Sequence, residues 1–128
     1  ILLIMAALDD EQALELEACA LDYGMDVLIE VHDASELDRA CKLTSPLMGI
    51  NNRNLKTMEI SLDVGAAMLP RLPDDRIAVA ESGLFSPADL ARMAKADARC
   101  FLIGESLMRA DNVAAATAAI LENPVAAG

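Results

Sequence analysis

An α/β fold built from repeated strand–helix units is predicted by two features of the sequence. Between short apolar runs, apolar residues recur three and four positions apart, which is typical of amphipathic helices. The runs lack strict apolar–polar alternation, as expected of parallel strands buried on both faces. Their spacing of roughly 20–30 residues suits a βαβ unit. The runs are Ile1–Met5, Val27–Val31, Leu47–Ile50, Ile77–Ala80 and Cys100–Ile103.

Such a series predicts either a doubly wound sheet or part of a (β/α)8 TIM barrel. A whole barrel takes roughly 250 residues. The 128 residues of the chain therefore suffice for about half of one, with five parallel strands alternating with helices. Because Ile1 already belongs to an apolar run, we expect the chain to start partway through a larger domain.

Helix boundaries are marked by ordinary capping signals, taken here in chain order. Acidic residues or caps begin helices at Asp9-Asp10-Glu11, Asp33, Ser86-Pro87-Ala88-Asp89 and Asp111-Asn112. Gly24, after Tyr23, is predicted to cap the end of the first helix. An Ala-rich last helix is expected over Val113–Leu121, ended by Asn123-Pro124.

The composition excludes several classes of function. The net charge of −11 argues against nucleic acid, which needs clustered Lys and Arg, and only three aromatic residues are available for base stacking. No apolar run approaches the roughly 20 residues that span a bilayer. The 3 cysteines are odd in number and lack metal-ligand spacing, which favours reduced thiols and a cytoplasmic location, with Cys100 buried in its strand.

Candidate functional residues are the polar residues that follow the strands, because parallel α/β folds place their sites at the carboxyl ends of strands. Gly83 and Gly104 follow the last two strands. Glycine allows close approach of the backbone, and helix N-termini bind anions. The alternative is that these glycines only turn the chain. Their pairing on the last two strands favours a phosphate site.

Two carboxylates, Glu30 and Glu81, end apolar strands. Burial predicts a raised pKa, suited to proton transfer near neutral pH, although an ion-paired structural role is the alternative. Arg53 is equally suited to pairing with Glu30 or Glu81 and to holding a substrate carboxylate. His32, the only histidine, is interpreted as a helix-cap or supporting residue rather than a catalytic one.

Four strings in this order and spacing resemble indole-3-glycerol phosphate synthase. They are Leu28–Asp33, Gly49–Leu55, Ala80–Gly83 and Ile103–Met108. The resemblance covers essentially the whole chain. It implies that residues 1–128 correspond to the C-terminal half of the synthase domain, from the fourth barrel strand onward.

The resemblance implies ring closure, decarboxylation and dehydration of 1-(2-carboxyphenylamino)-1-deoxyribulose 5-phosphate to indole-3-glycerol phosphate, a step of tryptophan biosynthesis. It implies no metal and no cofactor. Glu30 resembles the family's proton-transfer acid, and Asn51 its substrate-orienting asparagine. Arg53 is similar to the arginine beside the anthranilate carboxylate, and Glu81 and Ser82 resemble the pair at the reacting centre.

The phosphate-binding amides implied by the resemblance belong to Gly83, Gly104 and Glu105. The implied apolar walls for the substrate ring are Leu55, Leu84 and Leu102. In the family, a glutamate and two lysines lie on earlier strands, and one lysine is thought to be the general acid. These positions would precede Ile1, so we expect little or no activity from this chain alone.

Two alternatives remain open from the sequence. Another phosphate-binding barrel, such as phosphoribosylanthranilate isomerase, also has glycines after its last strands. A non-catalytic half-barrel that binds a phosphorylated ligand or acts as an oligomerisation scaffold would keep the glycines without the chemistry. In every case the expected partner is a phosphorylated small molecule, with neither nucleic acid nor membrane. Self-association through open sheet edges is an added expectation.

Overall fold

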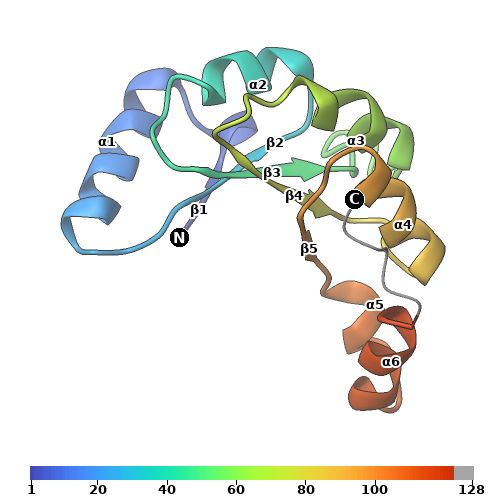
Figure 1. The fold of residues 1–128 in the computed structure, drawn as a ribbon. Helices are drawn as coiled ribbons and strands as arrows, with labels where there is room; N and C mark the ends of the chain where they lie inside the picture. The colour runs from blue at the N-terminus through green and yellow to red at the C-terminus, as the bar shows by residue number, and fades with distance from the viewer. Residues whose placement is uncertain (123–128) are drawn as a thin grey trace.

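The computed structural model describes residues 1–122 and contains one five-stranded parallel sheet (Figure 1). The strands are β1 (Leu2–Ile4), β2 (Leu28–Val31), β3 (Leu47–Asn51), β4 (Ile77–Glu81) and β5 (Cys100–Leu102). Each overlaps one predicted apolar run. Their order in the sheet is β1-β2-β3-β4-β5, with every neighbouring pair parallel. A doubly wound sheet reverses its strand order, whereas this sequential order is that of a barrel.

Helices follow the strands in alternation and lie along the outer side of the curved sheet (Figure 1). They are α1 (Asp10–Asp22), α2 (Ala34–Ala40), α3 (Leu62–Met68), α4 (Pro87–Lys95), α5 (Glu105–Met108) and α6 (Val113–Ile120). Two 3-10 turns, η1 (Met5–Ala7) and η2 (Leu69–Arg71), complete the elements. The described part of the chain is thus an open arc of a TIM barrel.

The predicted capping signals are confirmed. Asp9 and Ser86 begin α1 and α4 through reciprocal side-chain and backbone hydrogen bonds, and Asp33 and Asn112 accept from the first turns of α2 and α6. Gly24 has a φ of 70°, which glycine adopts readily at a helix end. The predicted stop at Asn123-Pro124 lies outside the described residues.

Helix α3 is the element that periodicity did not reveal. Ser61 is its N-cap, and the Ser61 side chain accepts a hydrogen bond from the backbone N–H of Asp63. The helix contains Gly65, and glycine weakens isolated helices. A Cβ on Gly65 would lie 2.7 Å from Oδ1 of Asn52. Glycine is therefore required by the close approach of α3 to the end of β3, and this tertiary contact outweighs helix propensity.

The apolar core lies between the sheet and the helices, where Ile29, Met48 and Ile50 are fully buried. The opposite, inner face of the sheet is covered only in part. Leu2, Leu28, Leu47 and Ile77 share one register row, and Leu2 and Ile77, on its flanks, are 45% and 41% exposed. Interior barrel positions form such rows, and in a whole barrel the other strands cover them.

The position of Cys100 corrects the sequence analysis. Its thiol was expected to be buried, but Cys100 is exposed. Cys100 lies on β5 and pairs in register with Val79 of β4. In the described part of the chain, β5 has a single strand neighbour. An apolar strand predicts burial only when both faces are covered. All three cysteines are free thiols.

Within residues 1–122 we find no helix of the length and apolarity needed to cross a membrane.

Candidate active site

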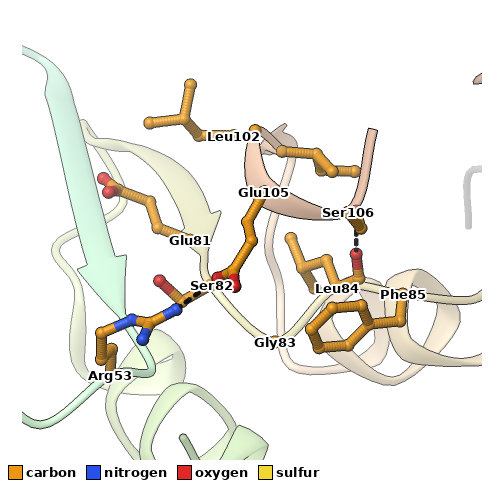
Figure 2. Close-up of a pocket in the computed structure, with 11 residues that line it drawn as sticks. Arg53, Glu81, Ser82, Gly83, Leu84, Phe85, Leu102, Glu105 and Ser106 are labelled. Carbon is orange, nitrogen blue, oxygen red and sulfur yellow. Dashed lines mark hydrogen bonds and ion pairs between the residues drawn. The ribbon is translucent and has the colours of Figure 1, made fainter. Parts of the chain in front are cut away.

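A cleft of about 370 Å³ opens at the carboxyl ends of β4 and β5 (Figure 2). The loops after β3, β4 and β5 supply its walls, as the parallel topology predicts. Its lining residues are Arg53, Glu81, Ser82, Gly83, Leu84, Phe85, Leu102, Ile103, Gly104, Glu105 and Ser106. Eight of the residues singled out from the sequence therefore lie around one cavity.

Glu30 and Asn51 lie beside this cleft, next to Glu81. The Asn51 side-chain amide donates to Oε1 of Glu30 at 3.0 Å, and Asn51 pairs in register with Glu81 across β3 and β4. All three side chains are buried, with Glu30 and Glu81 only 5% and 4% exposed. The sheet therefore brings two carboxylates from different strands to one buried point at the edge of the cleft.

Gly49 provides the space in which the Glu81 carboxyl group lies. Gly49 is the register partner of Glu30 on the neighbouring strand. A Cβ built on Gly49 would lie 1.9 Å from Oε1 of Glu81 and 3.1 Å from its Cδ. No real Cβ approaches an oxygen so closely, so only glycine allows the Glu81 carboxyl group to fold over β3 toward Glu30.

The electrostatics of this pair are asymmetric. Burial, reinforced by the neighbouring Glu30 carboxylate, raises the pKa of Glu81 from 4.5 to about 8. Oε1 of Glu81 is buried without a hydrogen-bond partner, whereas Glu30 accepts from Asn51. At pH 7 Glu81 is thus a neutral acid beside a hydrogen-bonded carboxylate. Two carboxyl groups held in different environments are a frequent arrangement for acid–base catalysis.

The glycines after β4 and β5 differ in local geometry. Ser82 and Gly83 both have positive φ, 63° and 74°. A Cβ on Gly83 would lie 2.7 Å from Cγ2 of Ile60, so the turn and its packing already require glycine there. At Gly104 a Cβ would meet nothing within 4 Å, which leaves its backbone open to the cleft. A non-glycine residue with positive φ, such as Ser82, is often found at functional sites.

A helix begins directly after Gly104 but not directly after Gly83. Gly104 is the N-cap of α5. After Gly83 the chain turns and enters α4 only at Pro87, with Ser86 as the cap. Gly83, Gly104 and Glu105 nevertheless line the same cleft.

Arg53 has a partner that the sequence analysis did not consider. Its guanidinium donates to Oε2 of Glu105 at 2.7 Å (Figure 2). Arg109 contacts the other oxygen of Glu105 at 3.0 Å. The expected alternatives, Glu30 and Glu81, are not its partners. This correction follows from topology, because the loop after β3 meets α5 across the mouth of the cleft.

The three leucines named as apolar walls are placed differently. Leu84 is buried and Leu102 is half exposed, and both line the cleft. Leu55 is 45% exposed in the turn after β3 and does not line it. Phe85, Ile103 and Ser106 line the cleft as well, and Ser106 Oγ donates to the Leu84 carbonyl at 3.2 Å (Figure 2).

Asn52 is a supporting residue that the sequence analysis passed over. It is 1% exposed, its amide donates to the Ser82 carbonyl at 3.1 Å, and its Oδ1 accepts from Gly65 N at 2.8 Å. It therefore fixes the Ser82 turn to α3. A polar residue directly after an apolar run was the signal that the sequence offered. Asn51 and Asn52 both fit that signal, so their spacing could not show which of them supports the turn.

Within residues 1–122 no cluster of three or more side chains is arranged to hold a metal.

Comparison with known proteins agrees with this arrangement. The family model described as indole-3-glycerol phosphate synthase matches residues 1–120. Similar relatives include the indole-3-glycerol phosphate synthase of Azospirillum brasilense, 58% identical over 94% of this chain and 46% of the relative. That of a Polaromonas species is 53% identical over 92% of this chain and 45% of its own length. The chain thus spans about half the length of these curated relatives.

Solved structures agree on the fold. One described as a native KDPGal structure superposes with a TM-score of 0.63 at 23% identity, covering 91% of this chain and 52% of that one. A mandelate oxidase with benzoyl-formic acid gives a TM-score of 0.62 at 15% identity, covering 79% of this chain and 30% of that one. At these identities the likeness shows the barrel architecture alone.

Proposed function

The chain belongs to the indole-3-glycerol phosphate synthase family, and from that premise we propose that it supplies the C-terminal half of a synthase active site. The reaction is ring closure, decarboxylation and dehydration of 1-(2-carboxyphenylamino)-1-deoxyribulose 5-phosphate. The observation that carries the proposal is the buried contact region of Glu30, Asn51 and Glu81 beside a cleft bordered by Gly83 and Gly104.

The acid–base steps are assigned to the two carboxyl groups. Ring closure and dehydration require protons to leave a carbon or nitrogen and to reach a departing hydroxyl group. Glu30, hydrogen-bonded by Asn51, is suited to accept a proton, and Glu81, neutral at pH 7, is suited to donate one. Asn51 and Ser82 orient the substrate at this centre, and Leu84 and Leu102 contact its aromatic ring.

The phosphate end of the substrate is assigned to the backbone amides of Gly83, Gly104 and Glu105. Because α5 has only 4 residues, its dipole alone is a weak attraction, and the amides of two loops must act together. Arg53 and Arg109 neutralise the Glu105 carboxylate, which reduces its repulsion of an anion. Arg53 retains donor capacity toward a substrate carboxylate.

The uncovered inner face implies a second half of the barrel. The register row of Leu2, Leu28, Leu47 and Ile77 would be covered by the strands that the relatives carry in the rest of their length. We therefore assign residues 1–128 to the C-terminal half of one synthase domain. We expect the catalytic lysines implied by the family to come from the other half, in the cytoplasm, where the thiols stay reduced.

Split-enzyme reconstitution tests the proposal. The chain is assayed alone and together with the remaining part of the Azospirillum brasilense relative, expressed as a separate polypeptide. Formation of indole-3-glycerol phosphate is followed by fluorescence. We expect no turnover from either part alone and measurable turnover from the mixture. Turnover by this chain alone would refute the division of the site, and an inactive but associated mixture would refute the activity.

A matched pair of variants separates chemistry from assembly. Glu30→Gln keeps the shape of the side chain but removes its basicity, so the mixture should lose at least about 100-fold in rate, as is typical of a lost general base. Glu15→Gln, an exposed residue of α1, serves as the control and should leave the rate unchanged. Phosphate-analogue binding that persists without turnover in either variant would instead support a non-catalytic half-barrel.

The family match favours the synthase over the isomerase alternative. The same reconstituted mixture, offered phosphoribosylanthranilate, should form no isomerised product.

A further inference from the structure

His32 lies between two carboxylates at the end of β2. Its Nδ1 is 3.0 Å from Oε2 of Glu36, and its Nε2 is 3.0 Å from Oε1 of Glu30. The Glu36 carboxylate also accepts from the backbone N–H of His32 at 2.8 Å. The imidazole is 9% exposed, and the Glu30 and Glu36 side chains are 7% and 14% exposed. No role in the site described above uses this histidine.

Both contacts are favourable when both ring nitrogens of His32 carry protons. A neutral imidazole carries one N–H, so its other nitrogen would turn a lone pair toward a carboxylate oxygen. At 3.0 Å in a buried setting, two facing lone pairs repel each other. The Nε2–Glu30 contact is not aligned as a hydrogen bond, so it acts through charge. An imidazolium satisfies both sides at once.

The titratable groups around His32 are all acidic side chains. Glu30 faces it from β2 and Glu36 from α2, and Glu81 of β4 lies beyond Glu30. Asp33 is engaged with the backbone of Glu36 as the cap of α2. Two largely buried carboxylates without a cation would be costly, and an imidazolium at His32 supplies the compensating positive charge.

We propose that His32 is a partly buried imidazolium that positions Glu30 and keeps it ionised, so that the proton of the Glu30–Glu81 pair resides on Glu81. The geometry supports this asymmetry: Glu30 receives Asn51 and His32, whereas Oε1 of Glu81 has no partner. The part that His32 plays in turnover rests on the proposed function. Its charge does not, because it follows from the two contacts.

Nitrogen NMR of the chain labelled with 15N-histidine tests the charge directly. His32 is the only histidine in the sequence, so its two ring signals need no assignment. At pH 8 an unperturbed histidine is almost entirely neutral. In the folded chain we expect both ring nitrogens to be protonated at pH 8, and in the same sample in urea we expect the neutral signals. One protonated and one bare nitrogen in the folded chain would overturn the proposal.

Two variants give a second, independent readout. Glu36→Gln keeps an acceptor for the backbone N–H of His32 but removes one of the flanking charges. The pH of half-protonation of the imidazole should then fall by about one unit, a tenfold loss of proton affinity. Glu15→Gln should not shift it. Equal titration of the parent and Glu36→Gln would overturn the charge assignment.

The positioning role is tested by the split-enzyme assay with His32→Gln. This variant keeps a donor but no charge, and it should lower kcat and move the acid limb of the pH profile while leaving KM within about twofold. A uniform loss across pH would indicate a merely structural role and contradict the proposal. If NMR finds an imidazolium but the reconstituted mixture shows no turnover, the proposed function is refuted and the charge assigned to His32 stands.

Discussion

Replacing Gly49 by alanine should separate the two carboxyl groups of the site. In the parent the Glu81 carboxyl group occupies the volume that a Cβ on Gly49 would need, with Oε1 1.9 Å from that position. Ordinary van der Waals contact begins near 3.4 Å, so the oxygen must move by about 1.5 Å. Leu28 Cδ1, at 3.4 Å, stands on another side of the Cβ and does not have to move.

The magnitude follows from burial and charge. Moving Glu81 toward the open cleft hydrates it and takes it away from Glu30, so its pKa should fall from about 8 toward 4.5. The added methyl group costs stability through overpacking, about 1–3 kcal/mol. A raised carboxyl pKa means that the folded chain binds the proton more tightly than the unfolded chain. The parent therefore loses stability as pH rises between 4.5 and 8.

Urea unfolding followed by circular dichroism from pH 4 to pH 9 measures both effects. Gly49→Ala should be least stable relative to the parent below pH 5, and the difference should shrink as pH rises, because the variant lacks the proton linkage. Gly104→Ala is the control, since its Cβ would meet nothing within 4 Å. A difference between Gly49→Ala and the parent that stays constant across this range would refute the reasoning about Glu81.

Three further outcomes are expected. Glu81→Gln should stabilise the chain by on the order of 2–3 kcal/mol at pH 9, after allowance for solvent screening at the cleft edge. Below pH 4, where the Glu81 carboxyl group is protonated, the substitution should have no effect. Urea unfolding at both pH values measures the difference. Arg76→Ala should lower the free energy of unfolding by roughly 2–3 kcal/mol, because Arg76 donates to the carbonyls of Ser45, Cys41 and Leu43. Arg99→Ala, at an exposed ion pair, should lower it by under about 1 kcal/mol, and thermal melts compare the two variants. The chain alone should self-associate through its uncovered inner face and open sheet edges, and a concentration-independent monomer in sedimentation experiments would contradict this.

The strands, the caps and the placement of the site were predictable because they depend on local rules. Apolar runs of strand length, capping boxes such as Ser86–Asp89 and the rule that sites lie at the carboxyl ends of strands need no tertiary information. Helix α3 was not predictable, because its Gly65 is explained by two distant residues, Asn52 just after β3 and Met93 of α4.

The remaining differences concern contacts between distant segments. Arg53 pairs with Glu105, 52 positions away, so no spacing rule could select it over Glu30 or Glu81. Cys100 is exposed on β5, which ends the described sheet and has one strand neighbour. For the two buried acids, the sequence predicted a raised pKa in general. The structure shows that burial, reinforced by the neighbouring Glu30, raises the pKa of Glu81.

The assignment of the catalytic centre to this chain is tested most directly by a graft into a working synthase. This chain replaces the aligned segment of the Azospirillum brasilense relative, with which it is 58% identical over 121 residues. The chimera is assayed for conversion of the carboxyphenylamino deoxyribulose phosphate to indole-3-glycerol phosphate. We predict turnover within about tenfold of the relative, lost on Glu30→Gln and retained on Glu15→Gln. A folded chimera without turnover, or one indifferent to Glu30→Gln, would contradict the assignment of the catalytic centre to this chain.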